Sequence, residues 1–119
     1  MIIRNSQIAA LRASLEASFE QRMVINLRKQ FVAFAAERSD EEIREFANSG
    51  RARAATYGID SEIDVEHFIE YAVIHGERFD LLPWAQKILT TDGVDGSKKM
   101  DWIDEYDQFV LNRDWDRPR

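Results

Sequence analysis

The sequence predicts an all-α protein, a single compact domain of about five helices of which the first is long. Two observations predict this fold class. Apolar residues recur at spacings of three and four along most of the chain, which is the period of an amphipathic helix. Nowhere do β-branched residues alternate with polar ones for long enough to predict a strand. We expect one helical domain over residues 1–112 and a loose C-terminal tail over residues 113–119.

The first helix is predicted from an apolar stripe, and Asn5 or Ser6 can cap its N-terminus. The stripe advances in steps of three or four through Ile8, Leu11, Leu15, Phe19, Met23, Leu27 and Phe31. A stripe of this kind points at a core, so we expect this face of the helix to be buried.

The second helix is predicted to begin at about Asp40. Ser39 stands three residues before Glu42, which is the spacing of a capping box. Gly58 lies where a left-handed C-terminal cap is wanted. Gly50 inside the helix costs about 1 kcal/mol relative to alanine, which suggests a close helix contact or a local bend.

The third helix follows from "DSEIDVEHFIEYAVIHG", with Ser61 as its cap and Gly76 at its end. Pro83 then marks the start of a fourth helix, because proline suits the first helical turn and the residue before it avoids helical dihedrals. Trp84 either fills this junction or lies flat on the surface. Four apolar residues of this segment are expected to face inward: Leu82, Ala85, Ile88 and Leu89.

A surface loop, "TTDGVDGSKK", precedes the fifth helix, which Ser97 can cap. This helix carries more large apolar groups than one core-facing stripe needs: Met100, Trp102, Ile103, Tyr106, Phe109 and Val110.

Charge is unevenly spread along the chain. The net charge is −6, and residues 59–119 carry 7 basic against 15 acidic residues, a net −8, while residues 1–58 carry 9 against 7. An acidic half repels nucleic acid and anionic lipid, so a basic protein is the more natural partner. The alternative is that the acid surplus only keeps the protein in solution. With no cysteine, no secretory signal and no membrane span, we expect a cytoplasmic protein.

No metal site is expected. His67 and His75 are eight residues apart and lie about 80° from one another around a helix, which does not suit a zinc pair. The loop at Asp92 and Asp95 lacks the alternating ligands and the final glutamate of a calcium-binding loop.

No catalytic residue and no cofactor are expected, and the chain is not expected to be an enzyme. A small hydrolase that uses Glu66, Glu70 or His67 remains an alternative, because the two glutamates share one face of a helix. A solvated helix face is the better explanation of these glutamates.

The candidate site is a protein-binding surface in the acidic half. Aromatic side chains among acids are typical of a recognition surface for another protein. The candidate residues are Trp84, Trp102, Tyr106, Phe109, Asp101 and Glu105, with Trp115 nearby in sequence. The alternative is that Trp84 and Trp102 belong to the core and Trp115 to a loose tail.

The stretches "ATYGI", "DVEHFIEYAVIHGERFD" and "LLPWAQKIL" resemble a family of small helical proteins encoded at bacterial type VI secretion loci, close to spike, PAAR-tip and effector genes. The stretch "SFEQRMVINLRKQF" resembles the family's first helix, and the resemblance covers most of residues 1–90. Val32 stands where the family has proline, which implies a softer break after the first helix.

The resemblance implies a cytoplasmic accessory protein, an adaptor or chaperone for an effector or for the spike tip. It implies no enzymatic activity. An immunity protein that neutralises a cognate toxin is the alternative, since an acidic surface suits a cationic toxin cleft. Self-association into a homo-oligomer is compatible with either role.

Overall fold

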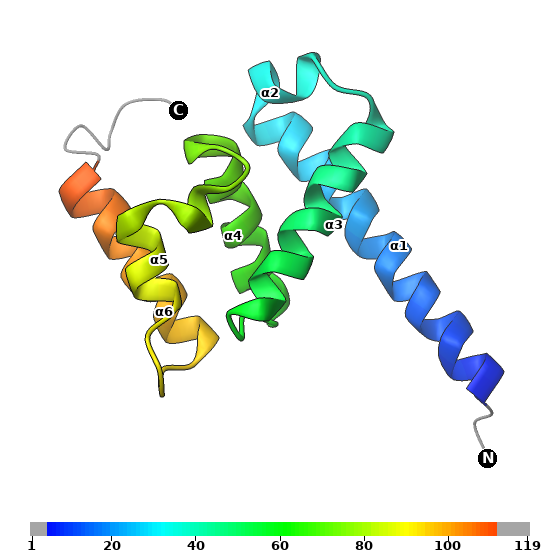
Figure 1. The fold of residues 1–119 in the computed structure, drawn as a ribbon. Coiled ribbons are helices and arrows are strands. Elements are labelled where there is room, and N and C mark those ends of the chain that lie inside the picture. Colours follow the sequence, from blue (N-terminus) through cyan, green and yellow to red (C-terminus); the bar gives the residue numbers. More distant parts are fainter. Residues whose placement is uncertain (1–4, 112–119) are drawn as a thin grey trace. The chain divides into compact units, whose positions relative to one another are not determined.

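The computed structural model describes residues 5–111, with side chains from residue 7 onward. The predicted all-α fold class is confirmed, since these residues form six α-helices and two short helical turns and contain no strand (Figure 1). The elements are α1 (Asn5–Gln30), α2 (Val32–Ala36), α3 (Asp40–Thr56), α4 (Glu62–His75), the 3₁₀ turn η1 (Phe79–Leu81), α5 (Pro83–Leu89), α6 (Gly96–Tyr106) and the π-helical turn η2 (Asp107–Leu111).

The chain divides into two compact units, residues 1–47 and residues 48–119, and the division falls inside α3. We call them unit 1 and unit 2. The expected caps Asn5 and Ser6 have side chains outside the described residues, as does the whole of the predicted tail over 113–119. The domain bounds 1–112 and 113–119 therefore stay a prediction.

In unit 1 the chain turns sharply between α1 and α2 at Phe31, whose backbone leaves the helical region with φ −125° and ψ 68°. Arg28 holds the turn together. Its guanidinium donates to the carbonyl oxygens of Ala35 and Arg38, at 3.0 and 3.1 Å, and to the Asp40 carboxylate at 2.6 and 2.9 Å. The helix thus breaks after Gln30 without the proline that the resemblance associates with this position.

The apolar stripe of α1 is only partly buried. Phe19, Met23 and Leu27 are buried, whereas Leu11 and Leu15 are 59% and 60% exposed and Ile8 is 38% exposed. The expectation that the whole face is buried is wrong for its N-terminal part. Helical period shows which side chains share a face, but it carries no information about how far along the helix another element covers that face.

Helix α3 begins and ends as predicted. The Ser39 N–H donates to Glu42 at 3.0 Å and the Glu42 N–H donates to the Ser39 hydroxyl at 3.1 Å, which is a complete capping box. Gly58 has a φ of 78°. Gly50 is a point of close helix contact, because a Cβ atom there would lie 2.9 Å from Cγ1 of Ile69 on α4.

Helices α4 and α5 also begin where the sequence predicts. The Ser61 hydroxyl accepts from the Asp64 N–H at 3.3 Å, and Pro83 occupies the first turn of α5. Of the four residues expected to face inward, Ala85 and Leu89 are buried and Ile88 is half-buried. Leu82 is exposed, because it is the residue before the helix and has extended backbone dihedrals that turn it away from the inward face.

The cap of α6 is Asp95, not Ser97 as the sequence suggested. The Asp95 carboxylate accepts from the Lys98 N–H at 2.8 Å. Ser97 lies in the first turn, and its hydroxyl donates to the Asp64 carboxylate at 2.6 Å. Two residues able to cap a helix stand two positions apart in the sequence, and the one that contacts α4 is not the cap.

Candidate functional site

Two polar contacts tie α4 to α6 in unit 2, and a third ties α4 to η2, which continues α6. Ser97 bonds to Asp64, the Tyr71 hydroxyl donates to Asp104, and His75 Nε2 lies 2.7 Å from Oδ1 of Asp107. In these three pairs, a later residue of the first segment contacts a later residue of the second. Helices α4 and α6 therefore run parallel. Helix α5 runs in the opposite direction beside α6 (Figure 1). The C-terminal ends of α4 and α6 and the N-terminal end of α5 therefore lie at one end of unit 2.

Aromatic rings fill the interior of this end. The Trp84 indole on α5 stacks on the Tyr106 ring of α6, with centroids 4.8 Å apart and planes 5° apart. His75 meets the same indole edge-on at 5.6 Å, and Phe79 lies 6.4 Å from it. Trp84 and Tyr106 are both half-buried. Because the indole stacks on one ring and meets two others, the N-terminal end of α5 is fixed against α6 and α4.

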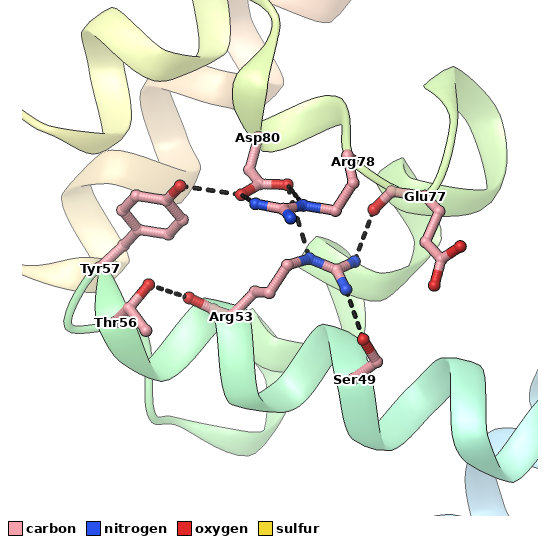
Figure 2. A network of polar contacts seen from close by, with 7 residues as sticks. All are labelled: Ser49, Arg53, Thr56, Tyr57, Glu77, Arg78 and Asp80. Atoms are coloured by element: carbon pink, nitrogen blue, oxygen red, sulfur yellow. Dashed lines mark hydrogen bonds and ion pairs between the residues drawn. The ribbon is translucent and has the colours of Figure 1, made fainter.

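A buried ion network fixes η1 against α3 (Figure 2). The Asp80 carboxylate is 1% exposed. It accepts two hydrogen bonds from the Arg78 guanidinium, both at 3.1 Å, and one from the Tyr57 hydroxyl at 2.8 Å. Nε of Arg53 lies 3.5 Å from the same carboxylate, and the Arg53 guanidinium also donates to the Glu77 carbonyl oxygen. The network therefore joins α3 to the turn that leads into α5.

Two pKa values follow from this network. Burial raises the pKa of Asp80, but the hydrogen bonds from Arg78 and Tyr57 and the arginine charges outweigh it, so the Asp80 pKa lies below its ordinary value. Burial, together with the bond to the Asp80 carboxylate, raises the pKa of Tyr57 to about 12. Asp80 is therefore ionised and Tyr57 is protonated at neutral pH.

Large apolar side chains lie exposed at the same end of unit 2. Leu81 and Leu82 precede Trp84 in the sequence, and three more exposed apolar residues follow Tyr106 in η2. The set, which we call the apolar end, consists of Leu81 (56% exposed), Leu82 (37%), Phe109 (71%), Val110 (52%) and Leu111 (43%). A π-helical turn such as η2 is rare and is frequently found at functional sites. An exposed apolar group of this size is typical of a protein-interaction surface.

The sequence-predicted site residues fall into two groups. Trp84 and Tyr106 are brought into contact, and Trp102 is half-buried on α6. The other three are exposed: Asp101, Glu105 and Phe109. Asp101 and Glu105 are four residues apart and share one face of α6. Trp115 lies outside the described residues.

The site predicted from the sequence did not include the leucines and Val110 of the apolar end, and it did not include Asp80. One signal for Asp80 was present in the sequence, since an acid stands between Phe79 and Leu81 in an otherwise apolar turn. A charged side chain between two apolar residues either points to solvent or is buried with a partner of opposite charge.

A small hollow of about 120 Å³ lies between α4 and α6, lined by His67, Glu70, Tyr71, Ile74 and Asp104. Burial is the main cause that raises the pKa of Glu70, and the charges of Glu66 and Asp104 add to it, although His67 opposes it. The hollow thus holds a carboxylate whose ionised form is disfavoured by its surroundings.

We expect Glu70→Gln to raise the melting temperature at neutral pH by a few degrees. A group whose folded pKa is raised binds its proton more tightly in the folded state, so its ionised form at neutral pH destabilises the fold. Removing the charge removes this cost. The gain should shrink as the pH falls through the Glu70 pKa, and thermal unfolding from pH 7 downward measures both effects. A lower melting temperature for the variant at pH 7 would contradict this account of Glu70.

Within residues 5–111, no group of three or more metal-ligating side chains is placed to hold a metal ion. No helix of the described part of the chain combines the length and apolarity that a membrane crossing requires. No protein-family model, curated protein or solved structure matches this chain. The type VI secretion family therefore stays a prediction from short sequence motifs.

Proposed function

We propose that this protein is a non-catalytic accessory protein that binds a partner protein through the apolar end of unit 2. The observation that carries the proposal is the exposure of the large apolar side chains of this end, of which Phe109 at 71% is the most exposed. Leu81 and Leu82 lie in the chain between Asp80, which the ion network holds, and Trp84, which stacks on Tyr106.

The charges beside the apolar end favour a basic partner. Asp101 and Glu105 are exposed on α6, and residues 59–119 carry a net charge of −8. A partner with apolar side chains surrounded by lysine or arginine would be complementary in both respects, and opposite potentials accelerate encounter.

The resemblance supplies the finer part of the proposal. We infer a cytoplasmic adaptor or chaperone for a type VI secretion effector or for the spike tip. An immunity protein is the second candidate, and the net charge of −8 over residues 59–119 favours it, because an acidic surface can block the cationic cleft of a toxin. An adaptor is required for effector stability or delivery and leaves the effector active. An immunity protein abolishes toxicity and inhibits the purified toxin.

Replacing Phe109 and Val110 by serine should abolish co-purification of the partner while leaving folding intact. Both side chains are exposed, so their loss removes contact area from the complex but little from the folded monomer. The experiment co-expresses the chain with each protein encoded beside it and compares recovery of the complex.

The matched control is Ile63→Ser. Ile63 is 65% exposed but lies in the first turn of α4, at the end of unit 2 remote from η2. Co-purification should survive this change. Equal loss of the complex in both variants, or a large drop in melting temperature for the Phe109 and Val110 double variant, would contradict a binding role for the apolar end.

A further inference from the structure

The N-terminal part of α1 is exposed on all sides in the described part of the chain. Residues 7–18 are all exposed, although α1 continues as helix to Gln30. Helical segments of about 12–15 residues are marginally stable in water without packing. The exposed face is also not a polar one, because Ile8, Leu11 and Leu15 continue the stripe whose later members, Phe19 among them, are buried. This segment combines the sequence signature of a packed helix with apolar side chains that are exposed in the described residues.

The two flanks of the exposed stripe differ in charge. At about 100° per residue, Ile8, Leu11 and Leu15 span about 60° of the helix surface. Arg12 and Glu16, four residues apart, lie along one flank. Ser14 and Ser18, which carry no charge, lie along the other flank. The charged flank also contains a hollow lined by Ile8, Ala9, Arg12, Ala13 and Glu16, where the small alanines leave room for a partner's side chains.

This asymmetry selects one kind of partner. When two identical helices pack antiparallel about a two-fold axis, each flank meets the same flank of the other copy in reversed order. In the register whose two-fold axis passes near Ser14, Arg12 of each copy faces Glu16 of the other. In a parallel pair the charged flank would instead meet the serine flank and gain no ion pair. The charge pattern of α1 is therefore complementary to itself in the antiparallel orientation only.

We propose that the N-terminal part of α1 is a self-association surface, on which a second copy of this chain packs antiparallel through Ile8, Leu11 and Leu15. The residues of this interface belong to unit 1, and those of the apolar end belong to unit 2. Because three helical turns bury less area than a standard interface, the dimer dissociates on dilution.

The test is sedimentation equilibrium of the full chain over a roughly hundredfold range of concentration. The mass should rise with concentration toward twice the 13.9 kDa of one chain. The double variant Leu11→Glu with Leu15→Glu should stay monomeric at every concentration. Both leucines are exposed, so the variant keeps the melting temperature of the monomer.

The matched control is Ala10→Glu with Ala17→Glu, which adds the same charges to the opposite side of the same helix. This variant should still dimerise. A chain that is monomeric throughout the range, or an equal loss of the dimer in both double variants, would overturn the proposal.

Charge exchange tests the orientation. Arg12→Glu alone should weaken the dimer by about tenfold, because it places like charges on the shared flank. Arg12→Glu combined with Glu16→Arg should restore it, since the reversed pair is again complementary in the antiparallel arrangement. A single variant without effect, or a combined variant as weak as the single one, would overturn the antiparallel pairing.

Discussion

Asp80→Asn is expected to destabilise the protein by about 3 kcal/mol, the low end of the range for breaking a buried ion pair. The change leaves the Arg53 guanidinium, which is 13% exposed, without its anion and weakens the two bonds from Arg78. Arg78 is itself 53% exposed and can be rehydrated, which keeps the loss from being larger. Thermal unfolding should show a melting temperature lower by about 10 °C or more.

Two further variants calibrate this loss. Tyr57→Phe removes one hydrogen bond to Asp80 and should cost about 1 kcal/mol. Asp101→Asn makes the same chemical change at an exposed carboxylate and should alter stability by no more than about 0.5 kcal/mol. If Asp80→Asn and Asp101→Asn unfold at the same temperature, the Asp80 network does not stabilise unit 2.

The pH dependence of the Asp80 variant follows from the direction of its pKa. A carboxylate whose folded pKa is lowered contributes stability that is fully present above its unfolded value near 3.8 and is lost as the pH falls through the folded pKa. The difference between the wild type and Asp80→Asn should therefore be constant at neutral pH and shrink below 3.8. For Tyr57 the sign is opposite, so its contribution is lost as the pH rises from 10 through about 12.

Gly96→Ala is the second substitution with a large expected effect. A Cβ atom on Gly96 would lie 2.3 Å from the carbonyl oxygen of Gly58 and 2.8 Å from Cα of Ile59. Both obstacles are backbone atoms and cannot rotate away, so the start of α6 must move from the segment that follows α3. We expect a loss of about 2–3 kcal/mol, typical of overpacking, despite the better helix propensity of alanine. Denaturant unfolding measures it.

Gly50→Ala is the matched control for this prediction. Its Cβ atom would also be crowded, at 2.9 Å, but by a side-chain atom, Cγ1 of the buried Ile69, and not by backbone. Alanine in the helix interior gains about 1 kcal/mol over glycine, which offsets the crowding. Stability should therefore change by no more than about 1 kcal/mol. A Gly96→Ala variant as stable as Gly50→Ala would show that the start of α6 is free to move.

The parts of the fold predicted from the sequence are those decided within a few residues. Ser39 and Ser61 cap their helices, Gly58 adopts a positive φ, and Pro83 opens α5. Each depends on dihedral preferences and on hydrogen bonds within one helical turn, which sequence spacing records.

The parts that the sequence did not predict depend on distant contacts. The exposure of Leu11 and Leu15 is set by how much of α1 other elements cover. The choice of Asp95 as the cap of α6 follows from the bond between Ser97 and Asp64, which are 33 residues apart. The candidate site was predicted as four aromatic residues with the acids Asp101 and Glu105, and of the aromatic residues the structure pairs Trp84 with Tyr106. The leucines that flank this pair are brought to the same end by the antiparallel course of α5, which helical periodicity does not encode.

Amide hydrogen exchange of the chain, alone and in complex with the partner recovered by co-expression, tests the central claim most directly. We predict slower exchange in the complex over residues 79–84 and 105–111, which contain the apolar end, and unchanged exchange over residues 61–67 around Ile63. Slower exchange confined to α1 or to the start of α4, with residues 105–111 unaffected, would contradict the claim that the apolar end binds the partner.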